Sequence, residues 1–302
     1  MRDLTFGVSL APTAADLDGV IGLAATAEES GLDLLGIQDH PYVAGFVDTM
    51  SLIGHVLART QRIRVFPDVA NLPLRPPAML AKASASLDLL SGGRFELGLG
   101  AGASQRAVTA MDGPRRSPGE ALAALEEGID VIRSMWRAGE TVRTGGDHHR
   151  VQGIHAGPAP AHDVGIWLGS VGPRSLNLTG RRADGWAAPI PAYLSYESRP
   201  DALAAIDAGA REAGRDPSDV LRIAQLVGTV TEAPTRQPTT HAGLQGSAPI
   251  QASPAQWAEL MHSLAEGLGF GAFIFWPEET TTTQLQRWAR DAVPATQERA
   301  AA

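Results

Sequence analysis

The sequence predicts a single (β/α)8 barrel of the TIM type, an α/β fold, over residues 1–302. Apolar runs that suit buried parallel strands alternate with helical patterns along the whole chain, and this unit occurs eight times. Three of the runs, within residues 34–40, 95–102 and 166–173, end in turns rich in small residues or in Asp-His. Hydrophobic residues make up 44% of the chain, which supports a large core. Eight strand–helix units favour a closed barrel over an open sheet, with ligands at the carboxyl ends of the strands.

The first half of the chain is predicted to contain four strands and their helices. Gly31 ends the first helix, because glycine readily adopts the left-handed conformation found there. Pro76 and Pro77 begin the third helix, since proline is tolerated in a first helical turn. The predicted strands are Leu4–Leu10, Leu34–Gln38, Ile63–Phe66 and Arg94–Leu99, and the helices are Ala14–Ser30, Asp48–Arg59, Ala78–Leu90 and Pro118–Arg137.

The second half continues this pattern, with insertions expected after strands four and seven and before strand five. The last of these, residues 141–163, is predicted to contain a short hairpin. Residues 232–252 are rich in Pro, Thr, Gln and Gly, and we expect a mobile loop that covers the functional end. The predicted strands are Gly165–Leu168, Gly185–Ala188, Leu221–Val230 and Ala272–Trp276, and the helices are Arg174–Arg181, Pro200–Ala213, Ser253–Leu268 and Thr282–Ala292.

The composition narrows the possible function classes. Lys and Arg number 25 against 33 Asp and Glu, and this net charge of −8 argues against a nucleic-acid partner. The chain has no cysteine, which excludes disulfides, thiolate catalysis and cysteine-bound clusters. The N-terminus lacks the apolar core of a signal peptide, and no apolar run is long enough to span a bilayer. We therefore expect a cytoplasmic protein without a membrane partner.

Asp39 and His40 are the first candidate catalytic residues. They end the second predicted strand, and Pro41 holds His40 in an extended or turn conformation. A histidine at this place can exchange protons near neutral pH, and the carboxylate can orient it or bind a ligand. The alternative is structural: Asp39 caps the loop and His40 packs beneath it. The residues alone leave both interpretations open.

Two glycine-rich turns offer backbone N–H groups to a ligand. Residues 98–103 resemble a dinucleotide loop only weakly, because no helix follows at once, and packing explains these glycines equally well. Residues 169–175 are a better anion site. Pro173 begins a helix there, so its free N–H groups and Arg174 can hold a phosphate.

Other polar residues carry weaker hypotheses. Asn71 follows the third strand and can bind a planar heterocycle, although an ordinary loop is the simpler explanation. Glu96 is either a buried polar group or, with Asp39, one of the two facing carboxylates of a glycosidase. The histidines within residues 141–163 have no spacing that gathers three ligands, so we expect no metal site. Trp276 either lines the pocket or packs in the core.

Together, these segments resemble the luciferase-like flavin and deazaflavin oxidoreductase family over almost the whole chain. Each motif alone is weak, but their order and spacing are specific for the family. The motifs are Glu28-Glu29-Ser30-Gly31, Gln38-Asp39-His40-Pro41, Asn71-Leu72-Pro73-Leu74-Arg75-Pro76-Pro77-Ala78, Leu80-Ala81-Lys82, Leu87-Asp88-Leu89-Leu90-Ser91-Gly92-Gly93-Arg94, Leu97-Gly98-Leu99-Gly100-Ala101-Gly102, Pro158-Ala159-Pro160, Ile166-Trp167-Leu168-Gly169 and Ala183-Asp184-Gly185-Trp186.

The resemblance implies a bacterial-luciferase-like barrel that holds a flavin or deazaflavin ring at the strand ends, in a protein that forms homodimers. It implies that His40 and Asp39 are catalytic residues beside the ring. It also implies a non-prolyl cis peptide between Asp68 and Val69, behind the ring. The positions that match cofactor-binding residues are Asp68, Val69, Asn71, Ala101, Gly102, Val171, Gly172 and Arg174, the last three near the phosphate.

The resemblance leaves two cofactors open. The first hypothesis is an oxidoreductase that uses the deazaflavin coenzyme F-420 (F420) to move hydride to or from a small organic substrate, because the segment Asp39-His40-Pro41 favours it. The alternative is an FMN-dependent monooxygenase that uses oxygen and a flavin reductase partner. The sugar-phosphate dehydrogenase branch carries a glutamate where this chain has Ala103, which argues against that particular activity. A cofactor-binding relative without activity is a third hypothesis.

Overall fold

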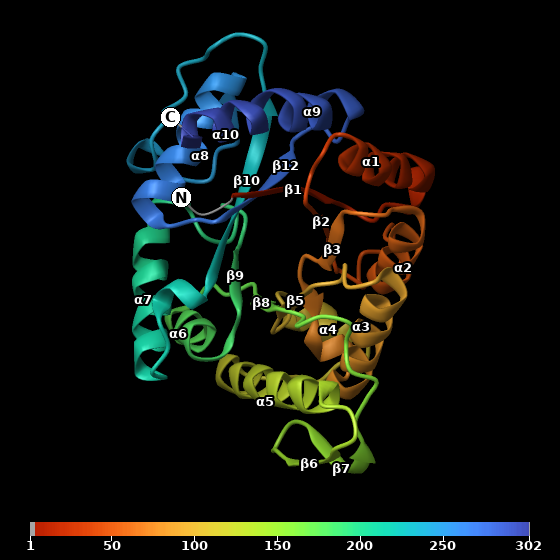
Figure 1. Cartoon of the computed structure of the whole chain (residues 1–302). Coiled ribbons are helices and arrows are strands. Elements are labelled where there is room, and N and C mark those ends of the chain that lie inside the picture. The colour runs from red at the N-terminus through yellow and green to blue at the C-terminus, as the bar shows by residue number, and fades with distance from the viewer. Residues whose placement is uncertain (1–3, 302) are drawn as a thin grey trace.

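The computed structural model describes residues 4–301, and its strands form the predicted parallel barrel (Figure 1). Their hydrogen-bonded order is β3-β2-β1-β12-β10-β9-β8-β5-β4. A parallel bridge between Val65 and Phe95 joins β3 to the chain just before β5 and closes the ring. β3 and β4 are two halves of the third predicted strand, so eight strand positions of the described chain surround the axis. The strands are β1 (Thr5–Leu10), β2 (Leu34–Ile37), β3 (Arg64–Pro67), β4 (Ala70–Asn71), β5 (Leu97–Gly100), β8 (Ile166–Leu168), β9 (Gly185–Ala188), β10 (Leu221–Val230) and β12 (Ala272–Pro277).

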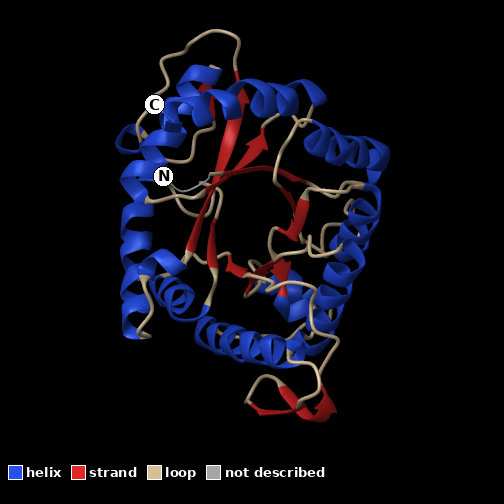
Figure 2. Cartoon of the chain, in the orientation of Figure 1, coloured by secondary structure: helices blue, strands red, loops and turns tan. Residues whose placement is uncertain are grey.

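Helices surround the barrel on the outside (Figure 2). None of the helices within residues 4–301 is both long and apolar enough to cross a lipid bilayer. The helices are α1 (Leu17–Glu29), α2 (Thr49–Arg59), α3 (Pro77–Ser91), α4 (Gln105–Ala110), α5 (Pro118–Trp136), α6 (Pro173–Arg182), α7 (Arg199–Glu212), α8 (Pro254–Leu268), α9 (Thr282–Arg287) and α10 (Val293–Ala301).

The helix ends follow local sequence signals. The Ser117 hydroxyl accepts the Glu120 N–H and the Glu120 carboxylate accepts the Ser117 N–H, which forms a capping box at the start of α5. Gly31, just after α1, has a φ of 90°, and Gly92, which caps α3, has a φ of 70°. Both lie in the left-handed region that favours glycine. These signals explain why the predicted boundaries agree with the structure within a few residues.

Two helices differ from the prediction. α4 lies between β5 and α5, where no helix was expected. The Ser104 side chain caps this helix. With six residues, α4 is too short for its sequence to show the apolar periodicity of a helix. The last helix was predicted to end at Ala292, but it continues as α10. Pro294 would ordinarily end a helix, but it lies in the first turn of α10, directly after a π-helical turn over Trp288–Ala292.

Two segments leave the barrel. The predicted excursion at residues 141–163 contains the antiparallel hairpin of β6 (Thr141–Gly145) and β7 (Arg150–His155), which projects beyond α5 in Figure 1. After β10 the chain forms a long connection and returns as β11 (Ile250–Ala252), which pairs in parallel with β10. The short strand β11 was not predicted.

The barrel interior is built in layers. Leu34, Phe66, Trp167, Ile223, Ala272 and Ile274 come from five different strands and form a buried cluster separate from the main core between strands and helices. Inward side chains recur at every second residue of a strand. The next inward positions are therefore Gly36, Asp68, Gly169, Gln225 and Trp276. An apolar layer thus gives way to one of glycines and polar groups, and the open space of the barrel begins there.

Candidate functional site

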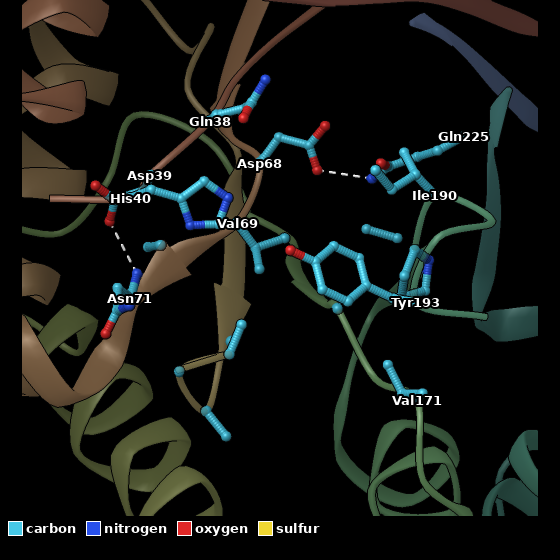
Figure 3. A pocket seen from close by; sticks show the side chains of 18 of the residues that line it. Gln38, Asp39, His40, Asp68, Val69, Asn71, Val171, Ile190, Tyr193 and Gln225 are labelled. Carbon is cyan, nitrogen blue, oxygen red and sulfur yellow. Dashed lines mark hydrogen bonds between the residues drawn. The ribbon is translucent and has the colours of Figure 1, made fainter. Parts of the chain in front are cut away.

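The carboxyl ends of the strands enclose a cavity of about 370 Å³ (Figure 3). Every strand position except β1 contributes to it, as the barrel fold predicts. The lining residues are Gln38, Asp39, His40, Asp68, Val69, Ala70, Asn71, Gly100, Ala101, Gly102, Ala103, Gly169, Val171, Ala187, Pro189, Ile190, Tyr193, Gln225 and Trp276. The structure therefore brings together the catalytic and cofactor-binding residues that the resemblance implied, except Gly172 and Arg174.

Asp68 lies at the floor of this cavity as a buried carboxyl group. It accepts hydrogen bonds from the Ser9 hydroxyl at 2.9 Å and from the Gln225 amide at 2.7 Å. Burial raises the pKa of Asp68 to about 6, although both hydrogen bonds oppose the shift. Ser9 and Gln225 were not identified as site residues from the sequence. Their role depends on their pointing to the inside of the barrel from β1 and β10, and the sequence does not show this orientation.

Val69 forms the wall above this floor. The Asp68–Val69 peptide bond is cis, as the resemblance implied. A Cβ atom on Gly100 or Gly169 would lie 2.8 or 2.9 Å from Val69 Cγ2, and one on Gly98 would lie 3.0 Å from Cγ1. Gly100 and Gly169 therefore make room for the valine side chain, whereas a Cβ atom on Gly98 would first collide with the Pro67 carbonyl oxygen. For Gly98 and Gly100, packing rather than direct ligand contact explains the residue type.

Asp39 forms its hydrogen bonds with neighbouring residues of the protein. Its carboxylate, with a side chain only 1% exposed, accepts hydrogen bonds of 2.8 Å from the Asn71 N–H and from Nε and Nη2 of Arg75. Burial alone would lower the pKa of Arg75, but Asp39 and Asp48 raise it above its ordinary value. In Figure 3 the Asp39 carboxylate points toward the Asn71 backbone rather than into the cavity. The sequence did not reveal this role of Arg75, although Arg75 belongs to one of the family motifs.

His40, by contrast, points into the cavity (Figure 3). Its Nδ1 lies 2.9 Å from the Tyr42 hydroxyl, and Nε2 has no hydrogen-bond partner within residues 4–301. Burial lowers the pKa of His40, and the nearby charge of Asp39 opposes this only in part. Burial also raises the pKa of Tyr42. At neutral pH the pair is therefore uncharged and leaves Nε2 for a ligand. Tyr42 was not predicted from the sequence.

Tyr193 lies across the cavity from His40. Its hydroxyl points toward Val69 and His40 in Figure 3, and the residue is 56% exposed at the mouth of the cavity. Ile190 lines the same side. Both residues lie in the loop after β9, where the sequence carries no chemical signature that would have identified them.

Two buried polar atoms at the cavity have no hydrogen-bond partner in the described part of the chain. They are Asn71 Oδ1, an acceptor, and Trp276 Nε1, a donor. A Cβ atom on Gly102, whose φ is 89°, would lie 3.5 Å from Asn71 Oδ1. Buried polar groups are normally satisfied, so unpaired atoms beside a cavity suit a bound polar molecule.

Of the predicted phosphate site at residues 169–175, only Gly169 and Val171 line the cavity. Gly172 caps α6 without a side-chain hydrogen bond, Pro173 is the first helical residue, and Arg174 is exposed. The first N–H groups of this helix therefore face solvent beside a cation, which suits an anionic group that extends from the cavity.

Glu96 does not reach the cavity. It accepts hydrogen bonds from Arg64 at 3.0 Å and from the Gly165 N–H at 2.9 Å, near the amino ends of β5 and β8. The hypothesis of a glycosidase with Asp39 and Glu96 as facing carboxylates is therefore wrong. Among the described residues, no group of three or more His, Asp or Glu is placed to hold a metal ion.

Comparison with known proteins agrees with this geometry. The family described as luciferase-like monooxygenase matches residues 4–298. The chain is 33% identical over 217 residues to a 5,10-methylenetetrahydromethanopterin reductase of Methanolobus tindarius, covering 72% of this chain and 63% of the relative. It is 34% identical over 171 residues to an F420-dependent glucose-6-phosphate dehydrogenase of Nakamurella multipartita, covering 54% and 50%. In both cases the match spans less than two thirds of the relative.

A solved structure shows the same fold over almost the entire chain. An F420-dependent secondary alcohol dehydrogenase, in complex with an F420-acetone adduct, superposes with a TM-score of 0.81. The match covers 97% of this chain and 99% of that protein, at 17% sequence identity. At this identity the likeness establishes the fold alone.

Proposed function

Because this chain belongs to the luciferase-like monooxygenase family, we propose that it is an oxidoreductase that uses coenzyme F420. It transfers a hydride to or from a small organic substrate. The glucose-6-phosphate dehydrogenase that is 34% identical over the matched region is named as F420-dependent, which supports this cofactor. When bound, the deazaflavin supplies or accepts the hydride, and it reacts poorly with oxygen because carbon replaces the reactive nitrogen of flavin.

The observation that carries the proposal is the uncharged, half-buried His40 in the cavity that gathers the strand ends. Hydride transfer to a carbonyl carbon requires a proton at the oxygen, and oxidation of an alcohol requires its removal. A histidine with a free Nε2 meets this need. If Tyr42 donates its hydroxyl proton to Nδ1, Nε2 carries a proton and donates it toward the substrate.

The residues around the cavity suit the other tasks of such a site. Val69 gives a flat apolar wall, and Asn71 Oδ1 offers an unsatisfied acceptor to a ring or ribityl donor. Ala101, Gly102 and Val171 line the same space, while Gly172 and Arg174 suit the phosphate. We assign Asp39 a positioning role, since it fixes the backbone beside His40 instead of facing the cavity. The Tyr193 hydroxyl offers a second hydrogen bond to the substrate oxygen.

A binding titration tests the choice of cofactor. Purified protein is titrated separately with F420 and FMN while tryptophan fluorescence and visible absorbance are recorded, because Trp276 lines the cavity. We expect saturable binding of F420 with weaker binding of FMN. Failure to bind either cofactor refutes the proposal.

The His40→Asn variant tests the proton-transfer role. We expect it to bind the cofactor normally but to lose turnover by about 10²–10⁴-fold. His55 is exposed on α2, so His55→Asn is the matched control and keeps full activity. Equal turnover in the His40→Asn variant and the unmodified protein contradicts the assignment.

The alternative is an FMN-dependent monooxygenase, which the activity named in the family description favours. This enzyme would consume oxygen and require a flavin reductase to supply reduced FMN. Tight FMN binding, together with oxygen uptake when reduced FMN is supplied, distinguishes it from the first proposal. Cofactor binding without turnover of any substrate would favour a non-catalytic relative.

The resemblance also supports a homodimer in the cytoplasm, for which light scattering of the purified protein is the test of assembly. That residues 232–252 form a mobile cover over the cavity stays a prediction. Thr235 bonds to Gln256 and His241 to Ser263, so this segment lies along α8, and none of its described residues lines the cavity. Hydrogen exchange with and without cofactor tests whether the segment opens.

A further inference from the structure

A second cavity lies beside a buried arginine on the outside of the barrel. Arg199 is the first residue of α7 and is only 1% exposed. Its Nη2 donates to the Gln225 carbonyl at 2.7 Å. The pairing of β10 with β9 ends at Ala224. The Gln225 carbonyl lies just beyond this pairing, and Arg199 supplies its hydrogen-bond donor. This contact accounts for one nitrogen of the guanidinium.

The rest of the guanidinium lacks polar partners. Nε and Nη1 make no hydrogen bond, and no carboxylate within residues 4–301 lies within 4.0 Å of it. The Tyr196 and Phe270 rings lie 4.7 and 5.6 Å from its central carbon, which stabilises a cation without neutralising it. Burial lowers the pKa of Arg199 to about 10, so it stays protonated at neutral pH. A buried charge without a counter-ion is costly to fold.

The cavity beside Arg199 measures about 240 Å³. Its walls come from the start of α7, the end of α8 and the segment after β10. The lining residues are Tyr196, Glu197, Arg199, Pro200, His241, Ala242, Leu244, Gln245, Leu264 and Leu268. Glu197 is the only carboxylate among them, and it accepts the Gly246 N–H at 2.6 Å. His241 Nδ1 lies 2.9 Å from the Ser263 hydroxyl. Neither group compensates the arginine.

We propose that this cavity is a second ligand site, which binds a small oxyanion through Arg199. The free Nε and Nη1 carry three of the five N–H donors of a guanidinium, and this donor geometry suits a carboxylate or a phosphate group. Both nitrogens are buried in the structure, so the ligand reaches them when a side chain that lines the cavity moves aside. The apolar side chains of Leu244, Leu264 and Leu268 shield the ion pair from water and strengthen it. The site is separate from the catalytic cavity and does not depend on the cofactor proposed above.

Calorimetric titration at constant ionic strength tests this site with inorganic phosphate and with acetate in separate experiments. Saturable binding is expected for at least one, and the tighter of the two identifies the class of ligand. The Arg199→Met variant should bind about tenfold or more weakly, because it loses the charge-assisted hydrogen bonds. Arg211, on the same helix with a side chain 67% exposed, provides the control Arg211→Met, which should bind normally.

Two further measurements keep the test decisive if Arg199→Met does not fold. Ala242 is exposed at the edge of the cavity, so Ala242→Trp should fold and obstruct entry, with binding weakened. A crystal soaked in selenate should show anomalous density against Arg199. Water alone in this cavity, or binding that neither substitution weakens, overturns the proposal.

Discussion

The substitution Asp39→Ala separates a positioning role of this carboxylate from a catalytic one. Asp39 holds two groups at once: the N–H of Asn71 and the guanidinium of Arg75, through three hydrogen bonds of 2.8 Å. Alanine removes all three acceptor contacts. Arg75 keeps its ion pair with Asp48 at 2.6 Å, but the Asn71 N–H stays buried without an acceptor.

The size of the effect follows from these contacts. Breaking a buried ion pair costs about 3–5 kcal/mol, and leaving a buried N–H unpaired costs about 1–3 kcal/mol within that total. The retained contact to Asp48, together with the 15% exposure of the Arg75 side chain, places the expected loss near the lower end, about 3 kcal/mol. For 302 residues the entropy of unfolding is about 0.6 kcal/mol/K, so the melting temperature should fall by about 5 °C.

Calorimetry of the variant measures this change, and Asp39→Asn is the informative companion. The amide keeps an oxygen acceptor but loses the charge, so we expect about half the loss of stability and less than about a tenfold loss of turnover. Asp18, exposed on α1, provides the neutral control Asp18→Asn. If Asp39→Asn retains the stability of the unmodified protein but loses as much turnover as His40→Asn, Asp39 exchanges protons itself and our reasoning is wrong.

Three other substitutions test the cavity. Tyr42→Phe removes the partner of His40 Nδ1, so the imidazole ¹⁵N shifts should report a changed tautomer ratio; unchanged shifts contradict the assigned hydrogen bond. Asp68 has a pKa raised from 3.8 to about 6, so the folded state holds its proton longer than the unfolded state, and stability falls as pH rises from 4 to 6. Relative to Asp68→Asn, urea unfolding should show the free energy of unfolding fall by about 2 kcal/mol over this range, and a flat difference refutes the assignment. Gly169→Ala places a Cβ 2.9 Å from the valine opposite and should cost about 1–3 kcal/mol, whereas Gly45→Ala, with open space, should cost little in the same urea assay.

Most of the barrel could be predicted because its signals are local. The apolar runs, the glycine after α1 and the prolines at the start of α3 act within a few residues of the element that they define. The division of the third strand into β3 and β4 carries no such signal. Only the resemblance to a family indicated the unusual peptide at Asp68–Val69. The short helix α4 escaped prediction for a related reason, since six residues show no period.

The candidate site was predictable only where it lies directly after a strand. His40 was identified because it directly follows the second strand, whereas Val69 and Gly102 were identified through the resemblance to the family. The partners of these residues were not identified. Tyr42 reaches His40 from within its own loop, and Gln225 reaches Asp68 from 157 positions away. Such contacts depend on how strands are arranged around the axis, and periodicity does not contain that information.

The residues that limit the depth of the cavity lie in a different layer of the barrel from His40. Phe66 and Trp167, whose rings meet edge to face at 5.1 Å, form a plug directly beneath Asp68. Trimming the plug would lengthen the well downward and leave the rim that carries His40 unaltered. A larger residue at Gly36, whose Cβ would lie 2.9 Å from an Asp68 oxygen, would push against the carboxyl group at the floor of the cavity. The length of the molecule that the cavity admits can therefore be changed by substitutions in the barrel interior, away from the loop that carries His40.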